Sequence, residues 1–101
     1  MANTEDFRNF AGGTLVEYED RKGYMSEYSR VNILEVRVPE RNSIEFITDG
    51  KAFLKTRDFH QITMQVRDGV FYFKPRYMGF CYAIAPKGVV IPTPEERTFW
   101  I

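Results

Sequence analysis

The residues best suited to binding chemistry are cations and aromatic rings in the second half of the chain. Residues 71–82 read Phe-Tyr-Phe-Lys-Pro-Arg-Tyr-Met-Gly-Phe-Cys-Tyr, so two cations are interspersed among six aromatic rings. Exposed rings stack on bases, and cations neutralise phosphates, in proteins that bind single-stranded nucleic acid. The candidate binding surface consists of cations and rings from this stretch and its surroundings: Lys55, Arg57, Tyr72, Lys74, Arg76, Tyr77 and Lys87.

The same stretch also has a purely structural interpretation. Along a strand, successive side chains point to opposite faces of the sheet. This alternation assigns Phe71 and Phe73 to the core and leaves Tyr72, Lys74 and Arg76 on the exposed side. Tyr77 is a further candidate for exposure. Because buried aromatic rings are common in small domains, core packing alone explains most of these rings.

Catalytic and metal-binding sets are missing from the sequence. His60 is the only histidine and Cys81 the only cysteine, so neither has the His or Cys partners that a zinc site or a nucleophile requires. Glu17, Glu19 and Asp20, with Asp6, are carboxylates that could serve acid–base work or a cation. Alternation instead places Glu17 and Glu19 together on a solvent face. We therefore predict no catalytic residue, no metal and no cofactor.

Charge is distributed unevenly along the chain. Residues 1–50 contain ten acidic and six basic residues, whereas residues 51–101 contain four acidic and eight basic ones, and the whole chain is neutral. One interpretation is a basic face that binds nucleic acid or an acidic partner. The other is that neighbouring strands carry opposite charges for cross-strand pairing.

The elements that position these residues are organised around a hairpin at residues 60–74. Asp68-Gly69 is a strong signal for a two-residue type I′ turn, because both residue types tolerate positive φ. With this turn at the centre, Met64 faces Phe73 and Val66 faces Phe71. The apolar residues of both arms then lie on one side of the ribbon. They are Ile62, Met64, Val66, Phe71 and Phe73. Because the apolar patterns of the two arms agree, they predict the register in which the two strands pair.

Further strands are predicted on both sides of this hairpin. Residues 13–19 form the first strand, and residues 24–28 pair back on it after a turn. Residues 31–38 form another strand, whose apolar pattern changes phase between Ile33 and Leu34, which either a β-bulge or a strand buried on both faces would explain. Residues 43–48 and 51–56 flank a second Asp-Gly at 49–50, which predicts a hairpin with Phe46 opposite Phe53 and Ile47 opposite Ala52. Residues 77–85 and 89–91 supply the last two strands.

Short helical turns are predicted at both ends of the chain. Thr4 as N-cap and Gly12 as a left-handed stop favour a helix that docks Phe7 and Phe10, with an extended arm as the alternative. Thr93, Pro94 and Glu96 indicate a capped turn near the C-terminus. We predict one mostly β domain over residues 1–101, a small antiparallel β-barrel or two-layer β-roll of about seven to nine short strands.

Composition narrows the functional classes. The chain has no apolar run that could span a bilayer and no signal-peptide pattern, and with one cysteine a cytoplasmic setting is expected. The prediction is a non-enzymatic module that binds a protein partner, as an adaptor, an assembly subunit or an inhibitor, with a viral or phage accessory protein as one example. The alternative is a β-barrel that binds single-stranded nucleic acid through its basic second half. Homo-oligomerisation stays open.

Overall fold

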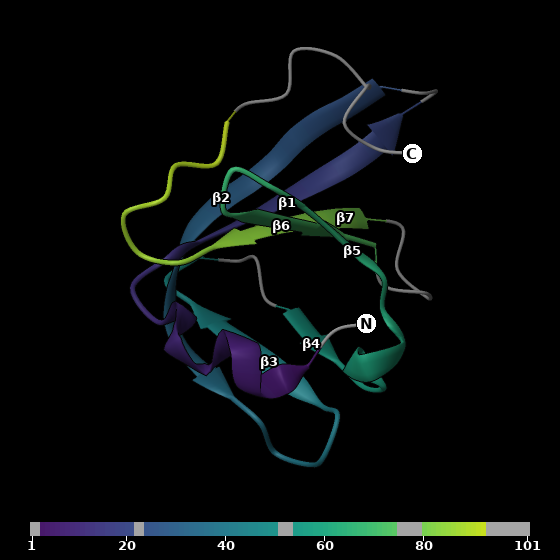
Figure 1. Cartoon of the computed structure of the whole chain (residues 1–101). Coiled ribbons are helices and arrows are strands. Elements are labelled where there is room, and N and C mark those ends of the chain that lie inside the picture. The colour runs from purple at the N-terminus through teal and green to yellow at the C-terminus, as the bar shows by residue number, and fades with distance from the viewer. Residues whose placement is uncertain (1–2, 22–23, 51–53, 75–79, 93–101) are drawn as a thin grey trace.

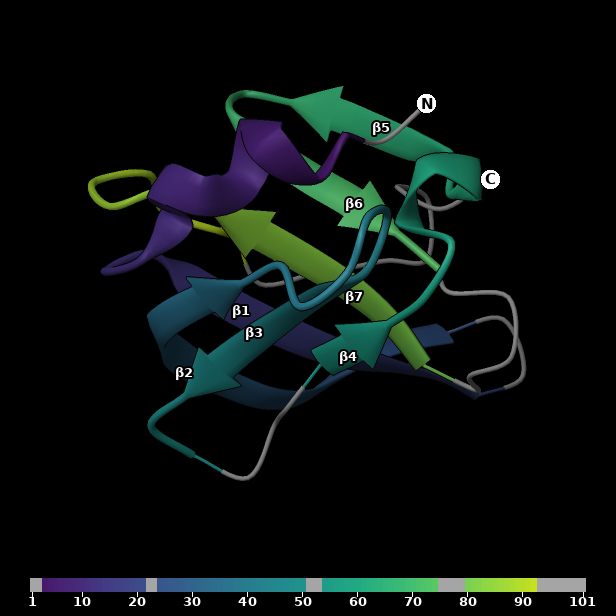
Figure 2. The same cartoon turned by 90° about the horizontal axis from the view of Figure 1, so that it is seen from below.

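The computed structural model describes residues 3–21, 24–50, 54–74 and 80–92, which form seven strands and two short helices. The strands build one antiparallel sheet in the order β4-β3-β2-β1-β7-β6-β5. The sheet curls into a half-barrel, and the N-terminal helix covers its concave side (Figures 1 and 2). The prediction of a mostly β, small barrel-like fold is confirmed.

Two meanders of consecutive strands make up this sheet. The first contains β1 (Thr14–Arg21), β2 (Tyr24–Arg37), β3 (Ile44–Thr48) and β4 (Leu54–Thr56). The second contains β5 (Met64–Arg67), β6 (Val70–Phe73) and β7 (Phe80–Ala85). Antiparallel pairing between β1 and β7 joins the two meanders, with Thr14 opposite Ala85.

The β5–β6 hairpin has the predicted turn and register. Asp68 and Gly69 have φ angles of 52° and 80°, both positive as a type I′ turn requires. Met64 lies opposite Phe73, and Val66 lies opposite Phe71. Turn chemistry and apolar pattern agree at this site, and the prediction is confirmed.

Strand β2 is one continuous strand with two bulges, where the sequence predicted two separate strands. Its pairing with β1 skips Tyr28, and its pairing with β3 skips Leu34. Leu34 is the position at which the apolar pattern changes phase, so the predicted bulge is confirmed. The extra residue lets Ile33 and Val36 both contact the concave core, although an uninterrupted strand would turn them to opposite faces.

The strands on either side of the second Asp-Gly, β3 and β4, pair antiparallel as predicted, but in another register. Phe46 pairs with Leu54, one residue away from the predicted partner Phe53, and Ala52 and Phe53 lie outside the described residues. Neither Asp49 nor Gly50 has the positive φ of a type I′ turn. The Asp49 carboxylate accepts hydrogen bonds from the backbone N–H and the side-chain amide of Asn32, at 2.9 and 2.8 Å. These bonds hold Asp49 against β2.

The N-terminal helix η1 (Thr4–Phe10) is a 3₁₀ helix, which corrects two details of the prediction. Its cap is Asn3 and not Thr4, because the Asn3 side chain accepts a hydrogen bond from the Glu5 N–H at 3.0 Å. Phe7 and Phe10 are buried as expected, and their rings pack edge-on against Phe71. The docking of these three rings closes the concave side of the sheet.

The sheet buries apolar side chains on both faces. Tyr82 and Ile84 of β7 belong to the concave core, whereas Cys81 and Ala83 belong to a second cluster on the other face. The chain after β7 contributes to this second cluster. Residues 89–91 were predicted as a strand, but they are not one: Pro86 to Val89 form a turn, and Ile91 packs into the second cluster at 1% exposure. The predicted C-terminal turn at residues 93–101 lies outside the described residues.

Candidate functional site

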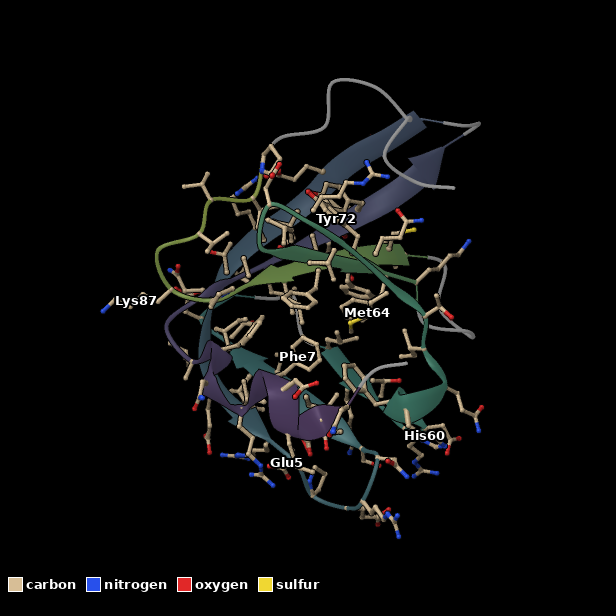
Figure 3. The ribbon with its side chains drawn as sticks, viewed as in Figure 1. Glu5, Phe7, His60, Met64, Tyr72 and Lys87 are labelled. Carbon is tan, nitrogen blue, oxygen red and sulfur yellow. The ribbon has the colours of Figure 1, made fainter. Side chains whose placement is uncertain are left out.

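The described cations of the predicted binding surface come from separate segments of the sheet. Lys74 follows β6 at the end where β7 begins, whereas Lys87 follows the end of β7. Lys55 lies on β4 directly opposite Glu45 of β3, and Arg57 follows it. Figure 3 shows Lys87 extending away from the molecule on the side opposite His60. Lys74 and Lys87 therefore lie at opposite ends of β7.

Tyr72 is buried at 5% exposure, so its prediction as an exposed ring was wrong. It lies on the outer face of the sheet, as alternation required, but that face is covered by the cluster that includes Ile91. Burial raises the pKa of the Tyr72 hydroxyl above its usual value. Arg76 and Tyr77 lie outside the described residues.

The candidate carboxylates do not assemble into a site. Glu17 accepts a hydrogen bond from the Tyr82 hydroxyl at 3.0 Å, and no group of three or more His, Cys, Asp or Glu side chains that could hold a metal occurs in the described part of the chain. Burial, followed by the nearby Glu17 carboxylate, strongly raises the pKa of Tyr82. Tyr82 thus stays protonated and serves as a donor to Glu17.

The two edges of the sheet differ in their protection against pairing with another chain. β4 is three residues long and carries the exposed Lys55, with Arg57 just beyond it. Short length and positive charge are the usual devices that prevent an edge strand from pairing. β5, at four residues, is also short, but it carries no charge before its last residue, Arg67, and its Val66 side chain is 57% exposed.

The register of the hairpin identifies which backbone groups of β5 face outward. Residues flanking a two-residue turn exchange backbone hydrogen bonds, and bonded pairs then alternate with non-bonded ones. Arg67–Val70 and Gln65–Tyr72 are the bonded pairs in this register. The N–H and C=O groups of Met64 and Val66 therefore point away from β6, toward the open edge of the sheet.

Large exposed apolar side chains are spread over three segments. They are Tyr28 and Leu34 at the bulges of β2, Val66 on β5 and Val90 after β7. Tyr28 is 63% exposed, and its ring lies 5.3 Å from that of Phe80. Exposed apolar side chains that stand singly are normal on protein surfaces. Among the four, only Val66 lies beside unpaired backbone groups of an edge strand.

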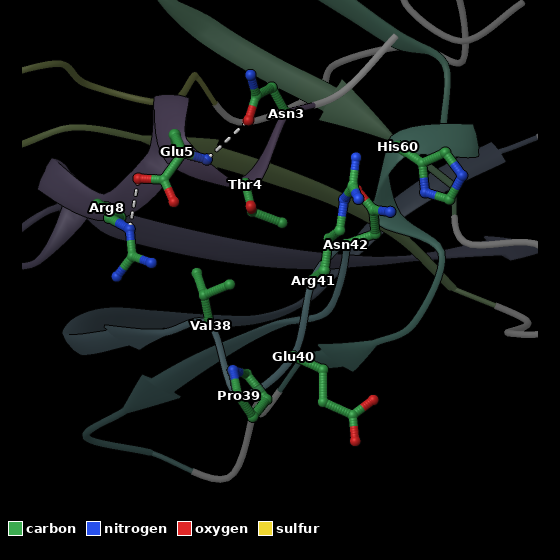
Figure 4. Close-up of a pocket in the computed structure, with 10 residues that line it drawn as sticks. All are labelled: Asn3, Thr4, Glu5, Arg8, Val38, Pro39, Glu40, Arg41, Asn42 and His60. Carbon is green, nitrogen blue, oxygen red and sulfur yellow. Dashed lines mark hydrogen bonds and ion pairs between the residues drawn. The ribbon is translucent and has the colours of Figure 1, made fainter.

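A polar groove of about 720 Å³ lies between η1, the loop from β2 to β3, and the short helix η2 (Phe59–Gln61) (Figure 4). We call it the polar groove and define it by its lining residues: Asn3, Thr4, Glu5, Arg8, Val38, Pro39, Glu40, Arg41, Asn42 and His60. Its volume falls within the range of about 300–1,000 Å³ that is usual for small-molecule sites.

Hydrogen bonds fix the walls of the polar groove. The Phe59 N–H donates to the Asn42 carbonyl oxygen at 2.7 Å, which ties η2 to the β2–β3 loop. Asn42 and Asp58 both have left-handed backbone angles, with φ of 65° and 51°, and Asn and Asp tolerate this conformation better than most residues. On the opposite wall Arg8 donates to Glu5 at 2.6 Å, and this bond lowers the pKa of the Glu5 carboxyl.

Sequence patterns identified neither the β5 edge nor the polar groove as a site. Of the groove residues, only His60 was weighed as a functional candidate, and it was set aside because the sequence has no second histidine. It lies in η2, and its Nδ1 is shielded from solvent and has no hydrogen-bond partner among the described residues. The groove is built from residues 3–8, 38–42 and 60, and no motif spacing links these segments.

Neither helix in the described part of the chain is long and apolar enough to cross a bilayer. Comparisons of this chain with protein-family models, with curated proteins and with solved structures found no match.

Proposed function

We propose that this protein is a non-enzymatic binding module that takes an extended segment of a protein partner along the free edge of β5. The observation that carries this proposal is that no strand of the described residues pairs with the outer edge of β5, which has outward backbone groups at Met64 and Val66 and no charge before Arg67. Peptides that add a strand to such an edge gain affinity from main-chain hydrogen bonds and specificity from alternate side chains. An adaptor, an assembly subunit and an inhibitor can each act in this way.

The affinity expected from this edge is modest. The N–H and C=O groups of two outward residues can make about four backbone hydrogen bonds, each worth about 0.5–1.5 kcal/mol net. Their sum, roughly 2–6 kcal/mol, is smaller than the roughly 8 kcal/mol of a micromolar complex. Side-chain contacts must supply the difference, and Val66 is the exposed apolar side chain on this strand. A screen should therefore use multivalent display, which detects weak binding.

The test is selection of peptides from a multivalent random-peptide display library on the immobilised full chain. Selected peptides are then synthesised, and their binding is measured by fluorescence anisotropy. The informative variant is Val66→Pro, which removes one outward N–H while leaving the bonded pairs of the hairpin intact. Proline is accepted on edge strands where the N–H faces solvent. We expect at least a tenfold loss of peptide affinity.

Val66→Thr is the matched control, because it keeps the N–H and the β-branched shape at the same position. Its affinity should stay within about threefold of wild type if backbone pairing dominates. Circular dichroism must show that both variants are folded. Recovery of no peptide, or equal peptide binding by Val66→Pro and wild type, would refute the proposal. A concentration-dependent dimer in light scattering that Val66→Pro abolishes would identify a second copy of the chain as the occupant.

Binding of single-stranded nucleic acid is the rival function. We rank it second because Lys55, Lys74 and Lys87 come from separate segments, with Lys74 and Lys87 at opposite ends of β7. Filter binding of oligonucleotides at two salt concentrations tests it directly, because phosphate contacts make affinity strongly salt-dependent. We expect no micromolar, salt-sensitive binding. If such binding occurs and the double variant Lys74→Glu/Arg76→Glu abolishes it, the rival function replaces our proposal.

A cytoplasmic location belongs to the same proposal. The support is that Cys81, the only cysteine of the sequence, is buried on β7 and has no second cysteine to pair with in this chain.

A further inference from the structure

Two acidic and two basic side chains line the polar groove, and only one of the two arginines has an ion pair in the described residues. Arg41 is exposed and lines the groove, and it makes no ion pair within the described part of the chain. The other arginine in the groove, Arg8, is already bonded to Glu5. In Figure 4, Arg41 extends toward Thr4 and His60, whereas the Glu40 carboxylate points away from them. The charge that faces the interior of the groove is therefore that of Arg41.

A second polar group in the same groove also lacks a partner. His60 Nδ1 is shielded from solvent and has no hydrogen-bond partner among the described residues. Leaving a buried polar atom unsatisfied costs about 1–3 kcal/mol, so such an atom in a native structure calls for an explanation such as a bound water or ligand. Two residues from separate segments that line one groove thus carry an arginine without an ion pair and a buried nitrogen without a partner, as far as the described residues show.

Another groove on the protein shows that this combination is not a general property of its surface. That groove, about 540 Å³ in volume, is lined by residues of β1, β2 and the segment 88–91. Its charged members are Arg30 and Asp49, and both are satisfied. Arg30 donates to Glu27 at 2.8 Å, and Asp49 accepts from Asn32. Of these two grooves, the polar groove alone combines an arginine that has no ion pair with a buried nitrogen that has no partner in the described part of the chain.

We propose that the polar groove binds an oxyanion of a small ligand, a carboxylate or a phosphate group, with Arg41 as its main donor. The guanidinium presents several N–H donors in a planar fork that matches either group. Asn42 and His60 stand beside it on walls that hydrogen bonds hold in place. A ligand oxygen that reaches His60 Nδ1 must displace the side chains that now shield this atom, so the environment of the ring should change on binding. Val38 and Pro39 supply an apolar floor for the rest of the ligand.

The single histidine makes this proposal directly measurable. Because His60 is the only histidine in the chain, its two ring protons give one assignable pair of signals in a proton NMR spectrum. We would titrate the full chain with inorganic phosphate and, separately, with succinate. Both titrations are run at constant pH and at ionic strength held with sodium chloride. We expect a saturable shift of the His60 ring signals with at least one of the two anions, and the stronger binder identifies the class of ligand.

Arg41→Gln is the variant that tests the assigned donor. It keeps a polar side chain of similar length and removes the charge, and we expect at least tenfold weaker anion binding. Arg37→Gln is the matched control, because Arg37 is an exposed arginine of β2 outside the groove and pairs with Glu35 at 3.0 Å. Its binding should stay within about twofold of wild type. No saturable shift with either anion, or equal weakening by both variants, would overturn the proposal.

Discussion

Truncation of Phe73 to alanine should reduce the free energy of unfolding by about 3–5 kcal/mol, the usual loss for a core aromatic ring. Phe73 is 1% exposed and lies opposite Met64 in the hairpin. Its ring stacks on Tyr82 at a centroid distance of 5.8 Å and meets the edge of Phe59 at 6.1 Å. Each such aromatic pair adds about 0.5–1.5 kcal/mol beyond area burial. We therefore expect a loss in the upper half of the range.

Such a loss is a large fraction of the roughly 5–15 kcal/mol that stabilises an ordinary domain. The melting temperature should fall on the order of 20 °C, because each kcal/mol corresponds to about 4–8 °C in a domain near this size. Urea unfolding followed by circular dichroism measures the change, and an unchanged m-value would confirm that the unfolding reaction is the same. Phe73→Leu should shift the midpoint less, in the same direction, and serves if the alanine variant does not fold.

Val66→Ala is the control within the same hairpin. Val66 shares the strand face of Met64 but is 57% exposed, so its truncation should change stability by less than about 0.5 kcal/mol. A larger loss for Val66→Ala than for Phe73→Ala would mean that the register and the burial of this hairpin are wrong. A melting temperature unchanged by Phe73→Ala would lead to the same conclusion.

Three further predictions concern other parts of the fold. Gly13→Ala should destabilise the protein by about 3 kcal/mol, because its Cβ would lie 2.0 Å from the Ala85 carbonyl oxygen, and thermal melting measures this loss. Stability should fall as pH rises above about 10, because the pKa of Tyr82 is raised in the folded state and the unfolded chain loses that proton first. The urea midpoint should therefore be lower at pH 11 than at pH 9, and this difference should be smaller for Tyr82→Phe than for wild type. Trp100 should emit at a shorter wavelength in the native than in the unfolded protein if the C-terminal segment docks; native emission at the water-exposed wavelength would contradict this.

The parts of the fold that the sequence predicted are those in which local signals agree with one another. At Asp68-Gly69 the turn chemistry and the apolar alternation of both arms indicate the same register. At Leu34 the apolar pattern of the strand changes phase, which marks the bulge. An extra residue is needed there so that the apolar side chains before and after it reach the same core. Asp49-Gly50 has the same turn chemistry, but neither Asp49 nor Gly50 has a positive φ. Phe46 pairs with Leu54 and not with Phe53. Asn32, far away in the chain, bonds the Asp49 carboxylate. A local pattern contains no information about such a partner.

The candidate sites were predicted less well than the fold, for a related reason. Alternation assigned Tyr72 correctly to the outer face of the sheet but could not show that Ile91 and its neighbours cover that face. The polar groove depends on three segments that meet only in the folded protein. Unpaired edges likewise depend on strand order, and the position of β5 at the edge follows from the β1–β7 pairing.

That pairing of the first strand with the last has a consequence for synthesis of the protein on the ribosome. Strands β1 to β4 can form their meander soon after they emerge, because each contacts its neighbour in sequence. β1, however, remains an edge until β7 has been made, since Thr14 pairs with Ala85. At about 5–20 residues per second the exposed edge persists for seconds. Long-range pairing of this kind also slows folding, so the nascent chain is most vulnerable to aggregation through β1.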